Sequence, residues 1–220
     1  FQGGYVGVDV FFVISGFLIS KLIHQERSKG KFSFVLFYER RARRILPPLF
    51  LVMIFCIPLA WRLMLPAEYE QFSNSLVATS LFSSNLLFWR ESGYFDGAAE
   101  LKPLLHTWSL AIEEQYYIFF PAIFIGLLKF GKKFAFFVVF IGFLLSFSLG
   151  IFLSEIKPTA SFYLLPTRAW ELLLGVLLAL ATINAKFGGR YPLWLKKKLG
   201  VIGIVLIVFS IVSFDAQTVM

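Results

Sequence analysis

The chain has 220 residues, of which 58% are hydrophobic and only 15% are charged, and its mean hydropathy is +0.77. A soluble domain carries about 25% charged residues, so this composition excludes an ordinary soluble protein and indicates one that lies in a lipid bilayer. The net charge of +8 would suit a nucleic-acid partner. However, the basic residues cluster between apolar runs, as topology signals do, and we expect no nucleic acid. The single cysteine, Cys56, excludes an intrachain disulfide framework and a cysteine-rich metal site.

Several apolar runs are long enough for a helix across the hydrocarbon layer, which takes about 20 residues. In chain order the predicted spans are 5–23, 45–61, 105–128, 134–153, 162–183 and 199–214. We therefore expect an all-α fold, a polytopic transmembrane helical bundle of about six spans that forms a single domain over residues 1–220. Gly142, Ser146 and Gly150 recur every four residues, a spacing that lets two helices approach closely.

The stretch 72–89 is apolar but is interrupted by Ser, Thr and Asn, and we do not expect a simple span there. If it does not cross and the N-terminus lies outside, sixteen of the 21 Lys and Arg residues fall on the inner side. A crossing would reverse every later loop and remove most of this asymmetry. The positive-inside rule therefore favours a re-entrant or interfacial segment. Such backbone is tolerated inside protein or along a wet cavity, so we expect the segment to line one.

The first polar motif, FYERRARRILPP at 37–48, is predicted on the inner side, just before a span. On a helix, Arg40, Arg41 and Arg44 share an arc of about 100°. Guanidinium groups bind phosphates through a fork of donors, which suits them to a phosphate clamp. The same residues would also serve as a topology anchor against anionic lipid headgroups. Spacing alone leaves both interpretations open.

The second motif, HTWSLAIEEQYY at 106–117, is predicted at the outer end of a span, on the face opposite the arginines. His106, Ser109 and Glu113 share one helical face. A catalytic triad needs histidine between nucleophile and acid, whereas here serine stands in the middle. Glu113 and Glu114 fit better in a buried polar network that could move protons or bind sugar hydroxyls. A purely structural network is the open alternative.

Two further sites contain ionisable residues inside predicted spans, where such residues are costly and need partners. Asp9 either pairs with a cation from another helix or touches substrate, and pairing is favoured. Arg168 and Glu171 are three residues apart, so they can neutralise each other on one helix. A structural ion pair is the favoured interpretation there.

Together these segments resemble the acyltransferase-3 family, the membrane O-acyltransferases that include bacterial lipopolysaccharide and peptidoglycan O-acetylases. The matching blocks, in the family's order and spacing, are GGYVGVDVFFVISGFLIS, FYERRARRILPPL, YFDGAAELKPLLHTWSLAIEEQYYIFFP and RAWELLLGVLLA. The resemblance implies a bundle of about ten helices in the bacterial inner membrane, with the Arg40–Arg44 cluster cytoplasmic. It also implies a cytoplasmic acyl-CoA, usually acetyl-CoA, as donor substrate, and a hydroxyl of an extracytoplasmic glycan as acceptor. No other cofactor and no metal are expected.

The resemblance also assigns roles to residues. The family's Arg-x-x-Arg-Ile-x-Pro pattern falls on Arg41 and Arg44, which together with Arg40 become the acyl-CoA candidates. The supporting active-site candidates that the resemblance implies are Asp9, His106, Trp108, Ser109, Glu113, Glu114, Arg168 and Glu171. The family's His-Thr-Trp-Ser-Leu…Glu-Glu-Gln pattern also falls on Gln115. The family's general-base histidine belongs to a helix expected before residue 1, so no base is assigned in this chain. Later helices, and a fused or separate periplasmic hydrolase-like domain, are expected after residue 220, and the chain alone is expected to be inactive.

Two other classes remain as alternatives. A transporter or flippase of a lipid-linked saccharide would also place polar groups at membrane depth and basic residues at a headgroup entrance. Such a protein has no use for acyl-CoA, so donor dependence separates it from an acyltransferase. A non-catalytic assembly partner would tolerate replacement of Glu113 or Arg41 except through stability.

Overall fold

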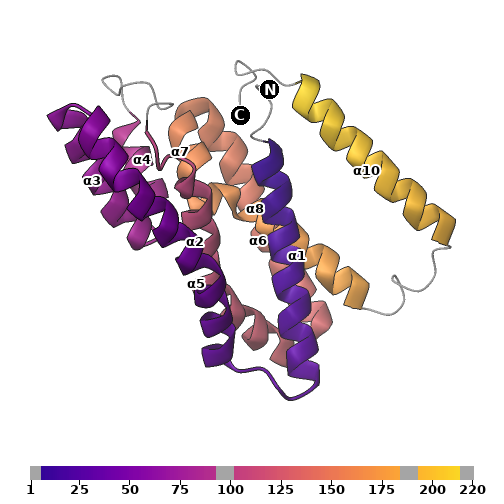
Figure 1. The fold of residues 1–220 in the computed structure, drawn as a ribbon. Coiled ribbons are helices and arrows are strands. Elements are labelled where there is room, and N and C mark those ends of the chain that lie inside the picture. Colours follow the sequence, from indigo (N-terminus) through magenta and orange to yellow (C-terminus); the bar gives the residue numbers. More distant parts are fainter. Residues whose placement is uncertain (1–5, 93–101, 184–192, 214–220) are drawn as a thin grey trace. The chain divides into compact units, whose positions relative to one another are not determined.

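The computed structural model describes residues 6–92, 102–183 and 193–213, and this part of the chain contains helices and no strand (Figure 1). The helices are α1 (Val6–Ser28), α2 (Phe34–Leu63), α3 (Pro66–Ser80), α4 (Ser84–Glu91), α5 (Thr107–Lys129), α6 (Lys132–Ile156), α7 (Pro158–Tyr163), α8 (Leu165–Ile183) and α10 (Leu193–Ser213). The predicted all-α fold is confirmed.

Five helices in the described ranges are long and apolar enough to cross a membrane, namely α1, α2, α5, α6 and α8. Each overlaps a predicted span. The sixth prediction, 199–214, overlaps α10, whose apolar part Gly200–Ser213 is shorter than the others. The predicted limits at residues 5 and 214 lie outside the described residues, as does the stretch 94–101 of the third sequence block.

Two boundaries differ from the prediction for physical reasons. Helix α2 begins at Phe34 rather than at 45, because the arginine-rich motif is compatible with a helix and simply continues the apolar one. The run 162–183 is broken after α7, and α8 begins at Leu165. Pro166 lies in the first turn of α8, where its missing N–H has no intrahelical partner to lose.

The stretch 72–89 forms no single long helix. Helix α3 has 15 residues and α4 has eight, and Phe82 between them has a positive φ of 52°. Neither helix has the roughly 20 residues that a crossing takes. The absence of a simple span here agrees with the prediction, while the choice between a re-entrant and an interfacial position remains a prediction.

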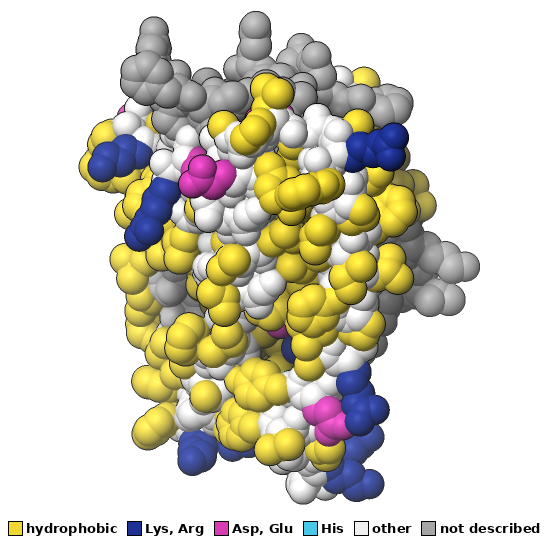
Figure 2. Space-filling model, turned by 60° about the vertical axis from the view of Figure 1, so that its left-hand side comes forward, with side chains coloured by type: hydrophobic (Ala, Val, Ile, Leu, Met, Phe, Trp, Pro, Cys, Tyr) yellow, Lys and Arg dark blue, Asp and Glu magenta, His cyan; other side chains and the backbone are white. Residues whose placement is uncertain are grey.

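The helices expose hydrophobic side chains in the manner of bilayer-facing helices. In α6, only 11% of the span is buried, and Phe137, Leu145 and Phe152 are each more than 60% exposed. Hydrophobic side chains cover most of the face drawn in Figure 2. Because the backbone of each such helix satisfies its own polar groups, it can lie in hydrocarbon. The chain is therefore a multi-pass membrane protein.

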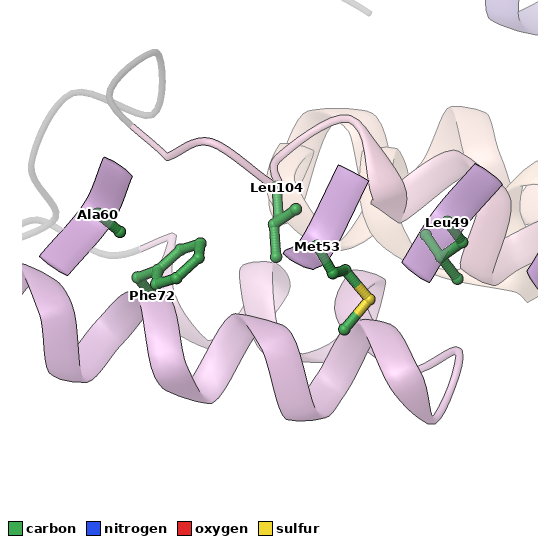
Figure 3. Packing of buried hydrophobic residues seen from close by; sticks show 5 residues of the cluster. All are labelled: Leu49, Met53, Ala60, Phe72 and Leu104. Carbon is green, nitrogen blue, oxygen red and sulfur yellow. The ribbon is translucent and has the colours of Figure 1, made fainter. Parts of the chain in front are cut away.

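The helices pack as two compact units, the first of which comprises Glu26–Pro121 with Tyr163–Leu165. Its hydrophobic core joins α2, α3 and the segment before α5 (Figure 3). The core consists of Leu49, Met53, Ala60, Phe72 and Leu104. Beside this core the hydroxyls of Thr79 in α3 and Thr107 in α5 are hydrogen-bonded at 3.0 Å. Helix α3 is thus fixed against the beginning of α5.

The second unit comprises the described residues within 1–25, 122–162 and 166–220. Within it α1 and α8 cross with their backbones in contact at Gly16 and Gly175. A Cβ added to Gly175 would lie 2.6 Å from the backbone nitrogen of Phe17, so only glycine fits. Helix α6 also packs closely on α8, where the Ser146 hydroxyl donates to the Pro166 carbonyl at 2.6 Å. A Cβ on Gly150 would lie 3.0 Å from a carbonyl oxygen of α8.

Candidate functional site

In the first unit, an arginine of α2 meets two glutamates of α5. The Nη2 atom of Arg41 lies 3.2 Å from Glu114 Oε1 and 3.7 Å from Glu113 Oε1. The guanidinium carbon lies 3.3 Å from the ring centre of Tyr117, and the Tyr117 hydroxyl donates to Glu113 Oε1. We call Arg41, Glu113, Glu114 and Tyr117 the Arg41 cluster.

The helical repeat explains why the α5 members of this cluster meet one cation. Positions 113 and 117 are four apart, so both lie on one face, and 114 flanks it. The three charged side chains are largely buried, with 18% of Arg41, 5% of Glu113 and 13% of Glu114 exposed. Buried charges need partners, and here two carboxylates share one guanidinium. Arg41 Nε is buried and has no hydrogen-bond partner among the described residues, so one donor of the fork is unused there.

The contact between Arg41 and the glutamates joins two motifs that charge placement assigned to opposite faces, and the membrane side of each motif stays a prediction. Glu113 and Glu114 come two turns after His106, well inside α5, and Arg41 lies in a helix that continues into the span. The distribution of Lys and Arg among the loops predicts on which side of the membrane a whole motif lies. It does not predict how deep in the membrane each residue of that motif lies.

The other arginines of α2 have different environments. Arg40 pairs with Glu26 at 2.8 Å and Arg43 pairs with Glu39 at 2.8 Å, and these arginine side chains are 51% and 78% exposed. Arg44 is exposed and makes no ion pair with any carboxylate in the described part of the chain. The four arginines of the motif are therefore one buried cation, two exposed paired cations and one exposed cation without an ion pair.

Around His106, the structure contains no serine-histidine arrangement. His106 is exposed and precedes α5, which begins at Thr107. The Ser109 hydroxyl donates to the backbone carbonyl of His106 at 3.2 Å, so it bonds the main chain. Trp108 is buried and packs edge-on against Tyr163 at 5.8 Å between ring centres. Ser109 and Trp108 therefore make structural contacts at the beginning of α5.

Gln115 belongs to a partly buried amide network. Its Nε2 group donates to the Phe82 carbonyl at 2.9 Å and to Asn85 Oδ1 at 2.8 Å. The Asn85 amide in turn donates to the Tyr163 carbonyl at 3.0 Å. Both carbonyls stand at breaks between helices, where no helical N–H is available. Sequence reasoning selected Gln115 but treated Asn85 only as a polar interruption, although a fully buried asparagine beside a helix break is a typical sign of such a role.

In the second unit, Arg168 joins three helices. Its Nη1 atom lies 2.8 Å from Asp9 Oδ1 of α1 and 2.8 Å from Glu171 Oε1 of α8. Its Nε donates to the Phe162 carbonyl of α7 at 3.2 Å. Glu171 is fully buried, whereas 32% of the Asp9 side chain is exposed. Ion pairing is thus the favoured interpretation at both positions, and the two predicted sites are one cluster, which we call the Arg168 cluster.

The two clusters share a chemistry. Each holds two carboxylates against one guanidinium and so carries a formal charge of −1 when all three groups are ionised. Glu171 Oε2 is buried and has no hydrogen-bond partner in the part of the chain that the structure describes. A cluster with more carboxylates than cations can accept hydrogen bonds from hydroxyls or bind a cationic group, and it repels anions. Within the described residues, no three His, Cys, Asp or Glu side chains lie close enough together to hold a metal ion.

A helical multi-pass membrane protein with arginine–glutamate clusters buried among its spans is the class that this fold and these sites define. The family model described as "Acyltransferase domain" matches residues 2–218. The chain therefore belongs to the acyltransferase-3 family.

Proteins similar to this chain are found in bacteria. A Haemophilus influenzae protein whose name states no function is 37% identical over 180 residues, which cover 79% of this chain and 74% of that protein. A candidate O-acetyltransferase of Staphylococcus aureus (strain COL) is 34% identical over 220 residues, or 96% of this chain and 36% of the relative. The O-acetyltransferase OatA of S. aureus (strain NCTC 8325) is 36% identical over 184 residues, or 81% and 30%. The chain thus spans about a third of these O-acetyltransferases, and no solved structure matches.

Proposed function

We propose that the protein containing this chain transfers an acyl group, acetyl in the first instance, from cytoplasmic acyl-CoA to a hydroxyl of an extracytoplasmic glycan. Family membership supports acyl transfer, and the names of the S. aureus relatives support an O-acetyl product. The observation that carries the proposal is the meeting of two motifs 73 residues apart, Arg41 with Glu114, in one buried cluster. A membrane protein without chemistry to perform has little reason to bury three charges there.

The donor is expected at the arginine-rich beginning of α2. Coenzyme A carries phosphates that guanidinium groups bind through charge-assisted hydrogen bonds. Arg40, Arg41 and Arg44 lie within a single turn and a half of α2. From this end the acyl-bearing arm would reach between the helices, where exclusion of water protects the thioester from hydrolysis.

We expect carboxylates, rather than arginines, to bind the acceptor glycan. Glu113 and Glu114 can accept hydrogen bonds from sugar hydroxyls, and in the Arg168 cluster Asp9 is the partly exposed carboxylate that can do the same. A base removes the proton from the acceptor hydroxyl as the oxygen attacks the thioester carbonyl, and the thiolate leaves and takes up a proton. We assign no residue of this chain to that proton transfer.

The test supplies radiolabelled acetyl-CoA and crude envelope glycan to membranes that contain the full-length protein. We expect alkali-labile label in the glycan, and loss of this label in Arg44→Ala and Glu113→Ala proteins that remain folded. Arg43→Ala, which removes an exposed arginine from the same helix, is the matched control and should retain transfer. Glycan movement across the membrane without acetyl-CoA, and no transfer with several acceptors, would instead indicate the transporter class.

A further inference from the structure

We propose that the two arginines of the Arg-x-x-Arg pattern have different tasks: Arg44 binds the phosphates of the donor, whereas Arg41 is a positioning residue that orients Glu113 and Glu114. The inference rests on the proposed function, because it takes acyl-CoA as the donor. It departs from the expectation that both arginines contact the donor alike.

Arg41 is held where it is by the charges around it. One of its terminal nitrogens faces both carboxylates, and the plane of its guanidinium lies against Tyr117. If Arg41 turned toward a phosphate, two neighbouring carboxylates would remain buried without a cation, which is strongly unfavourable. A phosphate that came to Arg41 instead would approach two negative groups within about 4 Å of the cation. Both routes disfavour a direct phosphate contact at Arg41.

Arg44 has none of these constraints. It lies one helical turn after Arg41, it is exposed, and no described carboxylate pairs with it. It can therefore bind an anion without breaking an existing ion pair. Arg40 and Arg43 differ from Arg44 in that each already has a carboxylate partner, Glu26 and Glu39 respectively, although exposed pairs of this kind are weak.

The role left for Arg41 is to fix the carboxylates. Glu113 accepts from the Tyr117 hydroxyl while the ring of Tyr117 supports the guanidinium, so the four groups hold one another in a single arrangement. Without Arg41, the like charges of Glu113 and Glu114 would repel and their side chains would turn apart. A loss of this kind affects turnover and acceptor binding rather than donor affinity.

Two donors separate the tasks, acetyl-CoA and S-acetyl-pantetheine, which is also a thioester but lacks the nucleotide phosphates. In the full-length protein, Arg44→Ala should raise the KM for acetyl-CoA about 10-fold or more, while its KM for acetyl-pantetheine stays within about 2-fold. Arg41→Ala should lower kcat about 10-fold or more with both donors and raise the acceptor KM, with the acetyl-CoA KM changed less than about 3-fold. Arg43→Ala is the control for loss of one positive charge from α2.

The inference is overturned if Arg41→Ala raises the KM for acetyl-CoA but not for acetyl-pantetheine, or if Arg44→Ala leaves the acetyl-CoA KM unchanged. If Arg41→Ala does not fold, Arg41→Lys replaces it, because lysine keeps a charge for Glu114 but loses the planar contact with Tyr117. A reduced kcat with an unchanged acetyl-CoA KM in Arg41→Lys supports the division, and a raised acetyl-CoA KM refutes it. Absence of transfer by the wild-type protein from either donor is a different result, which refutes the proposed function and this inference with it.

Discussion

Replacing Arg168 with alanine should be among the most destabilising single substitutions in the described part of this chain. One guanidinium nitrogen lies 2.8 Å from carboxylates of two helices, and Glu171 is fully buried. Removing one partner of a buried ion pair costs about 3–5 kcal/mol, because the other charge stays behind without compensation. The Phe162 carbonyl also loses its donor, which adds about 1 kcal/mol.

The free energy of unfolding can be measured by denaturant titration in detergent micelles. Arg43→Ala removes the same side chain from an ion pair in which the arginine is 78% exposed, and it should cost no more than about 1 kcal/mol. The double variant Arg168→Ala/Glu171→Gln removes the buried charge as well and should recover a large part of the loss. If Arg168→Ala is no more destabilising than Arg43→Ala, the Arg168 cluster does not stabilise the fold and the reasoning fails.

Three further substitutions test other contacts by the same titration. Gly175→Ala would drive a methyl group into the backbone of α1 and should cost about 1–3 kcal/mol. Gly126→Ala, which has open space around it, is its control and should gain up to about 1 kcal/mol; equal effects would contradict the close crossing. Gln115→Leu should cost about 2 kcal/mol and speed hydrogen exchange around the break at 81–83. The exposed Gln71→Leu should do neither, and unchanged exchange in Gln115→Leu would disprove the amide network. Tyr117→Phe keeps the ring against Arg41 but loses the hydroxyl bond to Glu113, so it should cost about 1–3 kcal/mol and less than Tyr117→Ala. A larger loss in the phenylalanine variant would mean that the ring contact contributes little.

Much of the fold could be predicted because a membrane-spanning helix is recognised from the hydropathy of its own segment. An apolar run of about 20 residues identifies a span whatever its neighbours do, so α1, α5 and α6 needed no tertiary information. The beginning of α2 could not be found this way, because the motif at 37–44 is polar and yet fully helical. The sequence predicted only that 72–89 is not a simple span. Its polar residues did not predict two short helices with a break at 81–83.

The candidate sites were predicted residue by residue but not as clusters. Asp9 and Arg168 were each expected to pair, and they pair with one another across 159 residues of sequence. The sequence shows that a charged residue inside a span needs a partner. It does not show which residue the partner is, because that depends on which helices pack together. Gly142, Ser146 and Gly150 indicated a close helix approach, which their contacts with α8 confirm. Gly7 and Gly16 of α1 are nine residues apart and α8 contains a single glycine, Gly175, so no glycine spacing marked this crossing.

The crossing of Gly16 and Gly175 limits how this protein can move. Side chains between two helices can change rotamer and let the helices slide, but here backbone meets backbone and nothing is left to rearrange. Helices α1 and α8 therefore move together as one rigid pair at this point, carrying Asp9, Arg168 and Glu171 with them. If the described helices rearrange, we expect the change at breaks such as those at 81–83 and at 164, where a hinge can absorb the change in backbone angles.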